Sequence, residues 1–123
     1  HEKYALTLLN TPYLWGGKGP LGIDCSGFIQ LIYQLCGKKL PRDAYQQAEL
    51  GDEIDTLTNT QTGDLAFFQN KEGKINHVGL ILDNNEIIHA SGKVRIDQLK
   101  EEGIFANDFK KITHKMHSIK RIN

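Results

Sequence analysis

"GIDCSGFIQLIYQLCG", residues 22–37, is the stretch that decides the fold of this 123-residue chain. From Ser26 onward, apolar residues recur at close to helical spacing, and Gly37 is a suitable stop just beyond the C-terminal end of a helix. The nearly continuous apolar content predicts that this helix is buried. Its first turn carries Cys25 between Asp24 and a serine, which makes the helix start the first candidate site.

The segments around this helix predict an α+β fold in a single domain, residues 1–123. A short helix is expected at 2–10, a Gly- and Pro-rich loop at 11–22, and a short surface helix at 41–51 with Asp43 as its N-cap. Strand-like runs follow without any βαβ alternation, so an antiparallel sheet is expected after the helices. These runs are 64–69, 77–82, 86–90 and 114–122.

The composition excludes several classes of partner. Formal net charge is zero and Lys and Arg form no cluster, which argues against nucleic acid and against a lipid surface. No apolar run approaches the ~20 residues that span a bilayer, so no membrane insertion is expected. The chain begins with His1 rather than Met, which indicates a domain of a longer or processed protein. No cofactor is expected.

Two interpretations of Cys25 stay open at this point. A cysteine is often a small buried apolar residue, but a helix N-terminus also stabilises a thiolate, and a thiolate is a nucleophile. A disulfide with Cys36 is not expected, because eleven residues of helix separate the two cysteines by ~16 Å. Cys36 is interpreted as a buried small residue.

His77 and His89 interrupt two apolar strands near their ends. If these strands pair through the intervening "DNN" turn, with residue 81 close to residue 88, the two rings share one face of the sheet. His1, His114 and His117 are interpreted as ordinary surface or hydrogen-bonded histidines. One cysteine and two histidines could ligate zinc, but the spacing matches no common zinc pattern, so no metal site is expected.

Nucleophilic catalysis gives each of these groups a task. The Cys25 thiolate attacks, an imidazole takes the thiol proton and later protonates the leaving amine, and a third polar group fixes the tautomer of that imidazole. We assign this third role to His89. Backbone N–H groups at the helix start are suited to holding the oxyanion of a tetrahedral intermediate.

Three segments carry a resemblance to a known family: "TPYLWGGKGPLGIDCSGF" (11–28), "TGDLAFFQNKEGKINHVGLIL" (62–82) and "NEIIHASGKVRID" (85–97). In this order they resemble the NlpC-type cell-wall peptidases, which are bacterial papain-like cysteine peptidases with a Cys–His–His triad. The resemblance implies Cys25 as nucleophile, His77 as base and His89 as the residue that orients the base. It also implies a papain-like arrangement, with the cysteine helix packed on an antiparallel sheet that bears the histidines.

The resemblance extends to the γ-D-glutamyl-L-diamino-acid endopeptidase branch of that family. It implies that Tyr13, Asp24 and Ser26 hold the free N-terminal amine of L-Ala-γ-D-Glu. Trp15 is expected to shape the cleft wall. Packing for the two aromatic residues, and helix capping for Asp24 and Ser26, stay open as alternatives. Arg95 is expected either to reach the site or to lie on the surface.

The expected function is hydrolysis of the γ-D-glutamyl-L-diamino-acid bond in peptidoglycan stem peptides at the bacterial cell envelope. Relatives in this branch carry an N-terminal β-barrel targeting domain that narrows the cleft, and this chain shows none. Two alternatives are a papain-like acyltransferase or thioesterase with the same thiol chemistry, and a peptidoglycan-binding module without catalysis.

Overall fold

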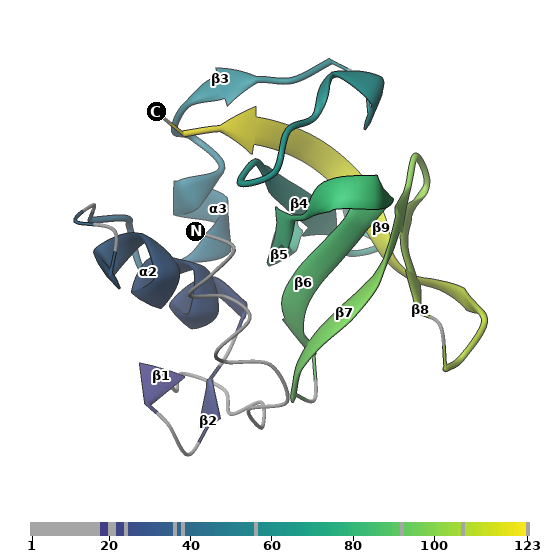
Figure 1. Cartoon of the computed structure of the whole chain (residues 1–123), viewed down its shortest axis with the longest axis horizontal. Coiled ribbons are helices and arrows are strands. Elements are labelled where there is room, and N and C mark those ends of the chain that lie inside the picture. Colours follow the sequence, from purple (N-terminus) through teal and green to yellow (C-terminus); the bar gives the residue numbers. More distant parts are fainter. Residues whose placement is uncertain are drawn as a thin grey trace.

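The computed structural model describes residues 18–19, 22–23, 25–35, 37, 39–55, 57–91, 93–106 and 108–122 (Figure 1). The helix expected at 2–10 lies outside these residues. The helices are α2 (Cys25–Leu35) and α3 (Ala44–Gln47), with 3₁₀ turns at Leu57–Asn59 and Asp83–Asn85. The strands are β1 (Lys18–Gly19), β2 (Gly22–Ile23), β3 (Asp52–Glu53), β4 (Leu65–Gln69), β5 (Ile75–Ile81), β6 (Glu86–Ser91), β7 (Lys93–Lys100), β8 (Gly103–Ala106) and β9 (Lys111–Arg121).

Seven of these strands form one antiparallel sheet in the order β3-β9-β4-β5-β6-β7-β8. Because β8 also pairs with β9, six of the strands close into a barrel, as the curled sheet in Figure 1 shows. Strands β1 and β2 form a separate small ladder. The α+β prediction holds in broad terms, but the described chain is mostly sheet, since β7, β8 and the two-residue strands β1, β2 and β3 add to the four predicted strands.

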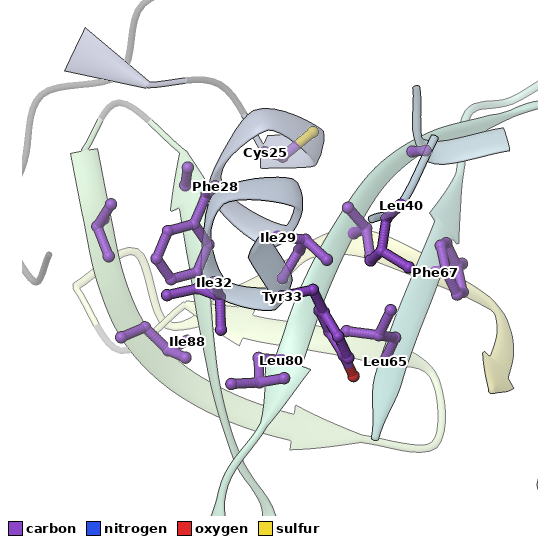
Figure 2. Packing of buried hydrophobic residues seen from close by; sticks show 14 of the residues in the cluster. Cys25, Phe28, Ile29, Ile32, Tyr33, Leu40, Leu65, Phe67, Leu80 and Ile88 are labelled. Atoms are coloured by element: carbon purple, nitrogen blue, oxygen red, sulfur yellow. The ribbon is translucent and has the colours of Figure 1, made fainter. Parts of the chain in front are cut away.

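Helix α2 packs one face against β4, β5 and β6. Figure 2 shows its apolar side chains directed at the sheet, and the largest of them are fully buried. The Tyr33 hydroxyl donates to the Gly63 carbonyl at 3.0 Å, which ties the far end of the helix to the turn before β4. Gly37 has φ of +85° and donates its N–H to the Gln34 carbonyl, so it ends the helix as predicted. The packed side chains are Phe28, Ile29, Ile32 and Tyr33 from the helix, with Leu65, Leu80 and Ile88 from the sheet.

Helix α3 is shorter and more buried than the surface helix predicted at 41–51. It spans only Ala44–Gln47, and Gln47 is completely buried. The Gln47 side-chain amide donates to the Ser26 carbonyl at 3.1 Å and to the Pro41 carbonyl at 2.8 Å. The bond to Ser26 ties α3 to the first turn of α2. Ala44 and Gln47 form the buried face of α3, whereas Tyr45 is 55% exposed.

A second apolar cluster fills the barrel interior. Along β5, Val78 and Leu80 face α2, whereas Ile81 faces the interior. Along β6, Ile88 faces α2 and Ile87 faces the interior. The interior cluster consists of Ala66, Phe68, Ile81, Ile87, Leu99, Ile104 and Ile119.

Candidate active site

His77 on β5 and His89 on β6 lie side by side, as the alternation of the two strands predicts. Gly79 pairs with His89 and Ile81 with Ile87, so odd-numbered residues of both strands share one face. This register is one residue away from the expected 81–88 pairing, which would itself have turned His89 to the opposite face. His77 Nε2 lies 2.9 Å from His89 Nδ1, and the two side chains are only 5% and 1% exposed. The two rings therefore form a buried hydrogen-bonded pair.

Asp97 on β7 continues this chain of hydrogen bonds. Its Oδ2 lies 2.8 Å from His89 Nε2, and the carboxylate is 1% exposed. Arg95 donates from Nε to the same oxygen at 2.7 Å and from Nη2 to Oδ1 at 3.0 Å, and it also contacts Asp108 at 2.5 Å. Arg95 thus reaches the site through Asp97, behind the histidines, and does not lie free on the surface.

The order of donors and acceptors follows from Asp97. A carboxylate only accepts hydrogen bonds, so His89 carries its proton on Nε2. Neutral His89 then accepts at Nδ1, which requires a proton on His77 Nε2. The unprotonated nitrogen of His77 is therefore Nδ1, the atom that a general base needs.

Burial keeps both histidines neutral. Desolvation lowers the pKa of His77 well below its usual value, and the neighbouring His89 and His114 lower it further. Desolvation also lowers the pKa of His89, although its hydrogen bond to the Asp97 carboxylate and the negative charge of that group oppose this shift. Each ring is consequently an acceptor on one side and a donor on the other near neutral pH.

His114 on β9 lies against His77, although its sequence context suggested an ordinary histidine away from the site. The two rings stack with centroids 4.1 Å apart and planes inclined by 23°. Phe68 also contacts both rings, with its centroid 5.7 Å from that of His77 and 6.1 Å from that of His114. Burial lowers the pKa of His114 to about 4, with a contribution from His89. The position of His114 depends on closure of the barrel by β8 and β9, which no local pattern predicts.

Cys25 is the first residue of α2, is 5% exposed, and forms no disulfide with any described residue. Its Sγ lies 3.9 Å from the Asn76 carbonyl oxygen, beside the start of β5. Asn76 is the extra residue of a β-bulge, because Ile75 pairs with Gln69 and His77 with Phe68. The helix start therefore meets the strand at the residue that precedes His77. Figure 2 shows Cys25 at one end of the helix, as a member of the buried apolar cluster.

Ser26 is the one predicted substrate-binding residue that the structure describes. It is 7% exposed, and its Oγ accepts a hydrogen bond from Arg42 Nη1 at 2.9 Å. Tyr13, Trp15 and Asp24, together with Cys36, lie outside the described residues.

Two further properties concern the described part of the chain alone. Within it, no three His, Cys, Asp or Glu side chains are arranged to hold a metal ion. Among its helices, none has both the length and the apolar character needed to cross a membrane.

A thiol at a helix start, packed on an antiparallel barrel that bears paired histidines, is an arrangement that cysteine hydrolases use. The model of the NlpC/P60 family matches residues 10–113, and the chain therefore belongs to the NlpC/P60 family, whose peptidases are cysteine hydrolases.

The named relatives are peptidases. The chain is 44% identical over 84 residues to the γ-D-glutamyl-L-lysine dipeptidyl-peptidase of Bacillus subtilis (strain 168), covering 67% of this chain and 28% of that protein. It is 42% identical over 81 residues to the murein DD-endopeptidase MepS/murein LD-carboxypeptidase of Escherichia coli (strain K12), covering 64% and 42%. The chain thus spans well under half the length of either relative.

Solved structures share the fold. An NlpC/P60 family protein from Bacillus cereus superposes with a TM-score of 0.78 at 30% identity, covering 95% of this chain and 37% of that one. RipD from Mycobacterium tuberculosis, described as a non-catalytic NlpC/p60 domain protein, superposes with a TM-score of 0.77 at 22% identity, covering 99% and 94%. The second likeness concerns the fold alone.

Proposed function

We propose that this chain is the catalytic domain of a cysteine endopeptidase that hydrolyses the γ-D-glutamyl-L-diamino-acid bond of peptidoglycan stem peptides. The observation that carries the proposal is the buried chain His77–His89–Asp97, whose first ring follows the residue that the Cys25 thiol contacts. The name of the Bacillus subtilis relative supports this choice of bond.

Acylation begins with transfer of the Cys25 thiol proton to Nδ1 of His77. The sulfur then attacks the γ-carbonyl carbon, and the carbonyl π electrons move to oxygen as an oxyanion. N–H groups in the first turn of α2 have no partner within the helix and are suited to stabilising that charge. The C–N bond breaks while His77 returns the proton to the leaving nitrogen, which departs as the amine of the diamino acid.

Deacylation reverses these roles with water. His77 Nδ1 takes a proton from water, the hydroxide attacks the thioester carbon, and the C–S bond breaks with return of the proton to sulfur. In both half-reactions His77 is transiently cationic, and its Nε2–H then donates to His89. Asp97 favours that charge through His89, so the carboxylate stabilises the imidazolium from one ring away.

The charge near Ser26 indicates which group of the substrate binds there. The Arg42 guanidinium bound to the Ser26 hydroxyl repels an ammonium group and attracts a carboxylate. We therefore assign the α-carboxylate of the γ-linked D-Glu to Arg42 and Ser26, and this proposal replaces the amine contact that the resemblance implied for Ser26. Recognition of the free L-Ala amine is assigned to Tyr13 and Asp24, with Trp15 at the cleft wall.

The test is release of lysine from L-Ala-γ-D-Glu-L-Lys, followed by mass spectrometry. The protein should release lysine, whereas C25A and H77A should lose nearly all activity. H117A is the matched control for H77A, since His117 is an exposed histidine of β9 whose contact is with the neighbouring Ser118. Wild-type rates in C25A would refute a thiol mechanism.

Two further substrates separate the remaining candidates. N-acetylation of L-Ala should slow cleavage strongly if the free amine is recognised, and equal rates would refute that part. A D,D-cross-linked peptide tests the bond named for the Escherichia coli relative, and an acyl ester tests the acyltransferase alternative. If no substrate is cleaved and Cys25 resists alkylation, a binding role without catalysis replaces the proposal.

A further inference from the structure

A pocket of about 540 Å³ lies next to the paired histidines, between the β4–β5 loop and β9. Two of its lining residues touch the site directly. His114 stacks on His77 at 4.1 Å, and the Asn76 carbonyl lies 3.9 Å from the Cys25 sulfur. The pocket therefore adjoins the reacting atoms on the histidine side. None of its described lining residues comes from α2 or α3.

The chemistry of the proposed reaction decides which part of the substrate lies on this side. His77 must deliver a proton to the departing nitrogen, so the leaving group lies next to the imidazole. Ser26 and Arg42, which we assign to the γ-D-Glu side, lie on α2 and next to α3. The pocket beside His114 is consequently on the leaving-group side of the scissile bond.

The charge of the pocket identifies the group that it suits. Lys71 and Lys115 line it from the loop and from β9, and its described lining holds no Asp or Glu. The other described lining residues include the amides Asn70 and Asn76 and the hydroxyl of Thr113, all able to hydrogen-bond. A cavity with two ammonium groups and no described carboxylate attracts an anion.

We propose that this pocket binds the free carboxylate of the leaving diamino acid, with Lys71 and Lys115 as the cationic partners. The enzyme then prefers stem peptides that end at the diamino acid over peptides in which that carboxyl group is an amide. This inference rests on the proposed function and adds the specificity of its leaving-group side.

Both lysines are exposed, so each ion pair is individually weak. At the values typical of exposed pairs, the two together give a preference of about threefold to tenfold for the free carboxylate. The contact exists equally in the ground state and the transition state, so the preference appears in KM rather than in kcat. Because salt screens exposed charges, the preference also shrinks as ionic strength rises.

The experiment compares kcat/KM for L-Ala-γ-D-Glu-L-Lys and for the same peptide with a C-terminal carboxamide. The wild-type protein should have the higher kcat/KM on the carboxylate peptide, and K71Q/K115Q should bring the ratio of the two kcat/KM values close to one by raising KM for that peptide. K74Q/K111Q removes the same charge from the same loop and the same strand, outside the described lining, and should keep the wild-type ratio.

The outcomes distinguish the inference from the function on which it rests. The subsite proposal is refuted if the wild-type protein cleaves both peptides with nearly equal kcat/KM. It is also refuted if K71Q/K115Q keeps the preference for the carboxylate peptide. Either result leaves the peptidase proposal standing. A ratio lost equally in K74Q/K111Q would reduce the effect to overall charge and also overturns the subsite. Absence of cleavage of either peptide refutes the proposed function and this inference together.

Discussion

Replacement of Asp97 by Asn tests the proposed chain of proton donors and acceptors. In the wild type, Oδ2 accepts from both His89 Nε2 and Arg95 Nε, while Oδ1 accepts from Arg95 Nη2. An amide keeps only one of these two acceptors. If its NH₂ group faces His89, then His89 must accept at Nε2 and donate at Nδ1, and His77 is forced to carry its proton on Nδ1.

That reversed tautomer offers the thiol an N–H group in place of a base. In the other orientation the amide oxygen faces His89, and the NH₂ group meets Arg95 Nη2, donor against donor. Where a carboxylate fixes the tautomer of a catalytic histidine, its replacement by the amide costs up to about 10⁴-fold in kcat, and we expect kcat of Asp97→Asn to fall by at least about 10-fold. Alkylation of Cys25 by iodoacetamide near neutral pH should slow in parallel, because less thiolate is present.

Asp108→Asn is the matched control. Asp108 also binds Arg95 but is 57% exposed, so its loss leaves the Asp97–His89 contact in place and should leave kcat within about twofold. Because the loss of a buried partner is destabilising, circular dichroism must confirm that Asp97→Asn is folded under assay conditions. A folded Asp97→Asn protein with wild-type kcat and wild-type alkylation would refute the tautomer argument.

Three other predictions follow from the same geometry. Gly79→Ala should lose about 1–3 kcal/mol of unfolding free energy in a urea titration, because the new Cβ would lie 2.6 Å from Ile87 Cδ1; an unchanged midpoint would contradict this packing. Folding holds the pKa of His114 at about 4, against about 6.5 in the unfolded chain. Between these pH values the unfolded chain binds more protons, so the free energy of unfolding falls as pH drops from 6.5 to 4. His114→Phe should make that fall smaller, as urea midpoints at pH 7 and pH 5 would show. The lowered pKa of His77 predicts that the acid limb of kcat/KM lies below pH 6.5, and a limb above 7 would exclude His77 as the base.

The sequence predicted the parts of the fold that depend on local patterning. Helix α2 and strands β4, β5, β6 and β9 follow apolar periodicity, and their existence was predicted correctly. The register between β5 and β6 differs by one residue from the expectation, because the 3₁₀ turn at Asp83–Asn85 holds the strands together through a bond from Leu82 N–H to the Glu86 carbonyl. The prediction that His77 and His89 share a face was nevertheless correct.

Strands β7 and β8 were not predicted, for two physical reasons. In β7 the charged Arg95 and Asp97 alternate with Val94 and Ile96. This alternation does not show whether the charged residues face solvent or form an ion pair against the rest of the barrel, as they do here. Strand β8 has only four residues, too few for a clear alternation, and it is held in place by pairing with β7 and β9. Asp97 and His114 were missed as site residues because both depend on these two features.

The residues assigned to catalysis and those assigned to substrate specificity come from different parts of the fold. His77, His89, Asp97 and His114 come from four strands of one closed barrel, so their relative positions are fixed by the same hydrogen bonds that close the sheet. The groups assigned to the leaving amino acid come instead from the β4–β5 loop and from exposed positions of β9. A change such as Asp97→Asn should therefore act on kcat for every substrate, whereas loss of the pocket lysines should act on KM and only for substrates with a free carboxylate. If both changes altered the same kinetic constant for both peptides, the base and the pocket would form one cooperative unit, and this division of roles between barrel and loop would be wrong.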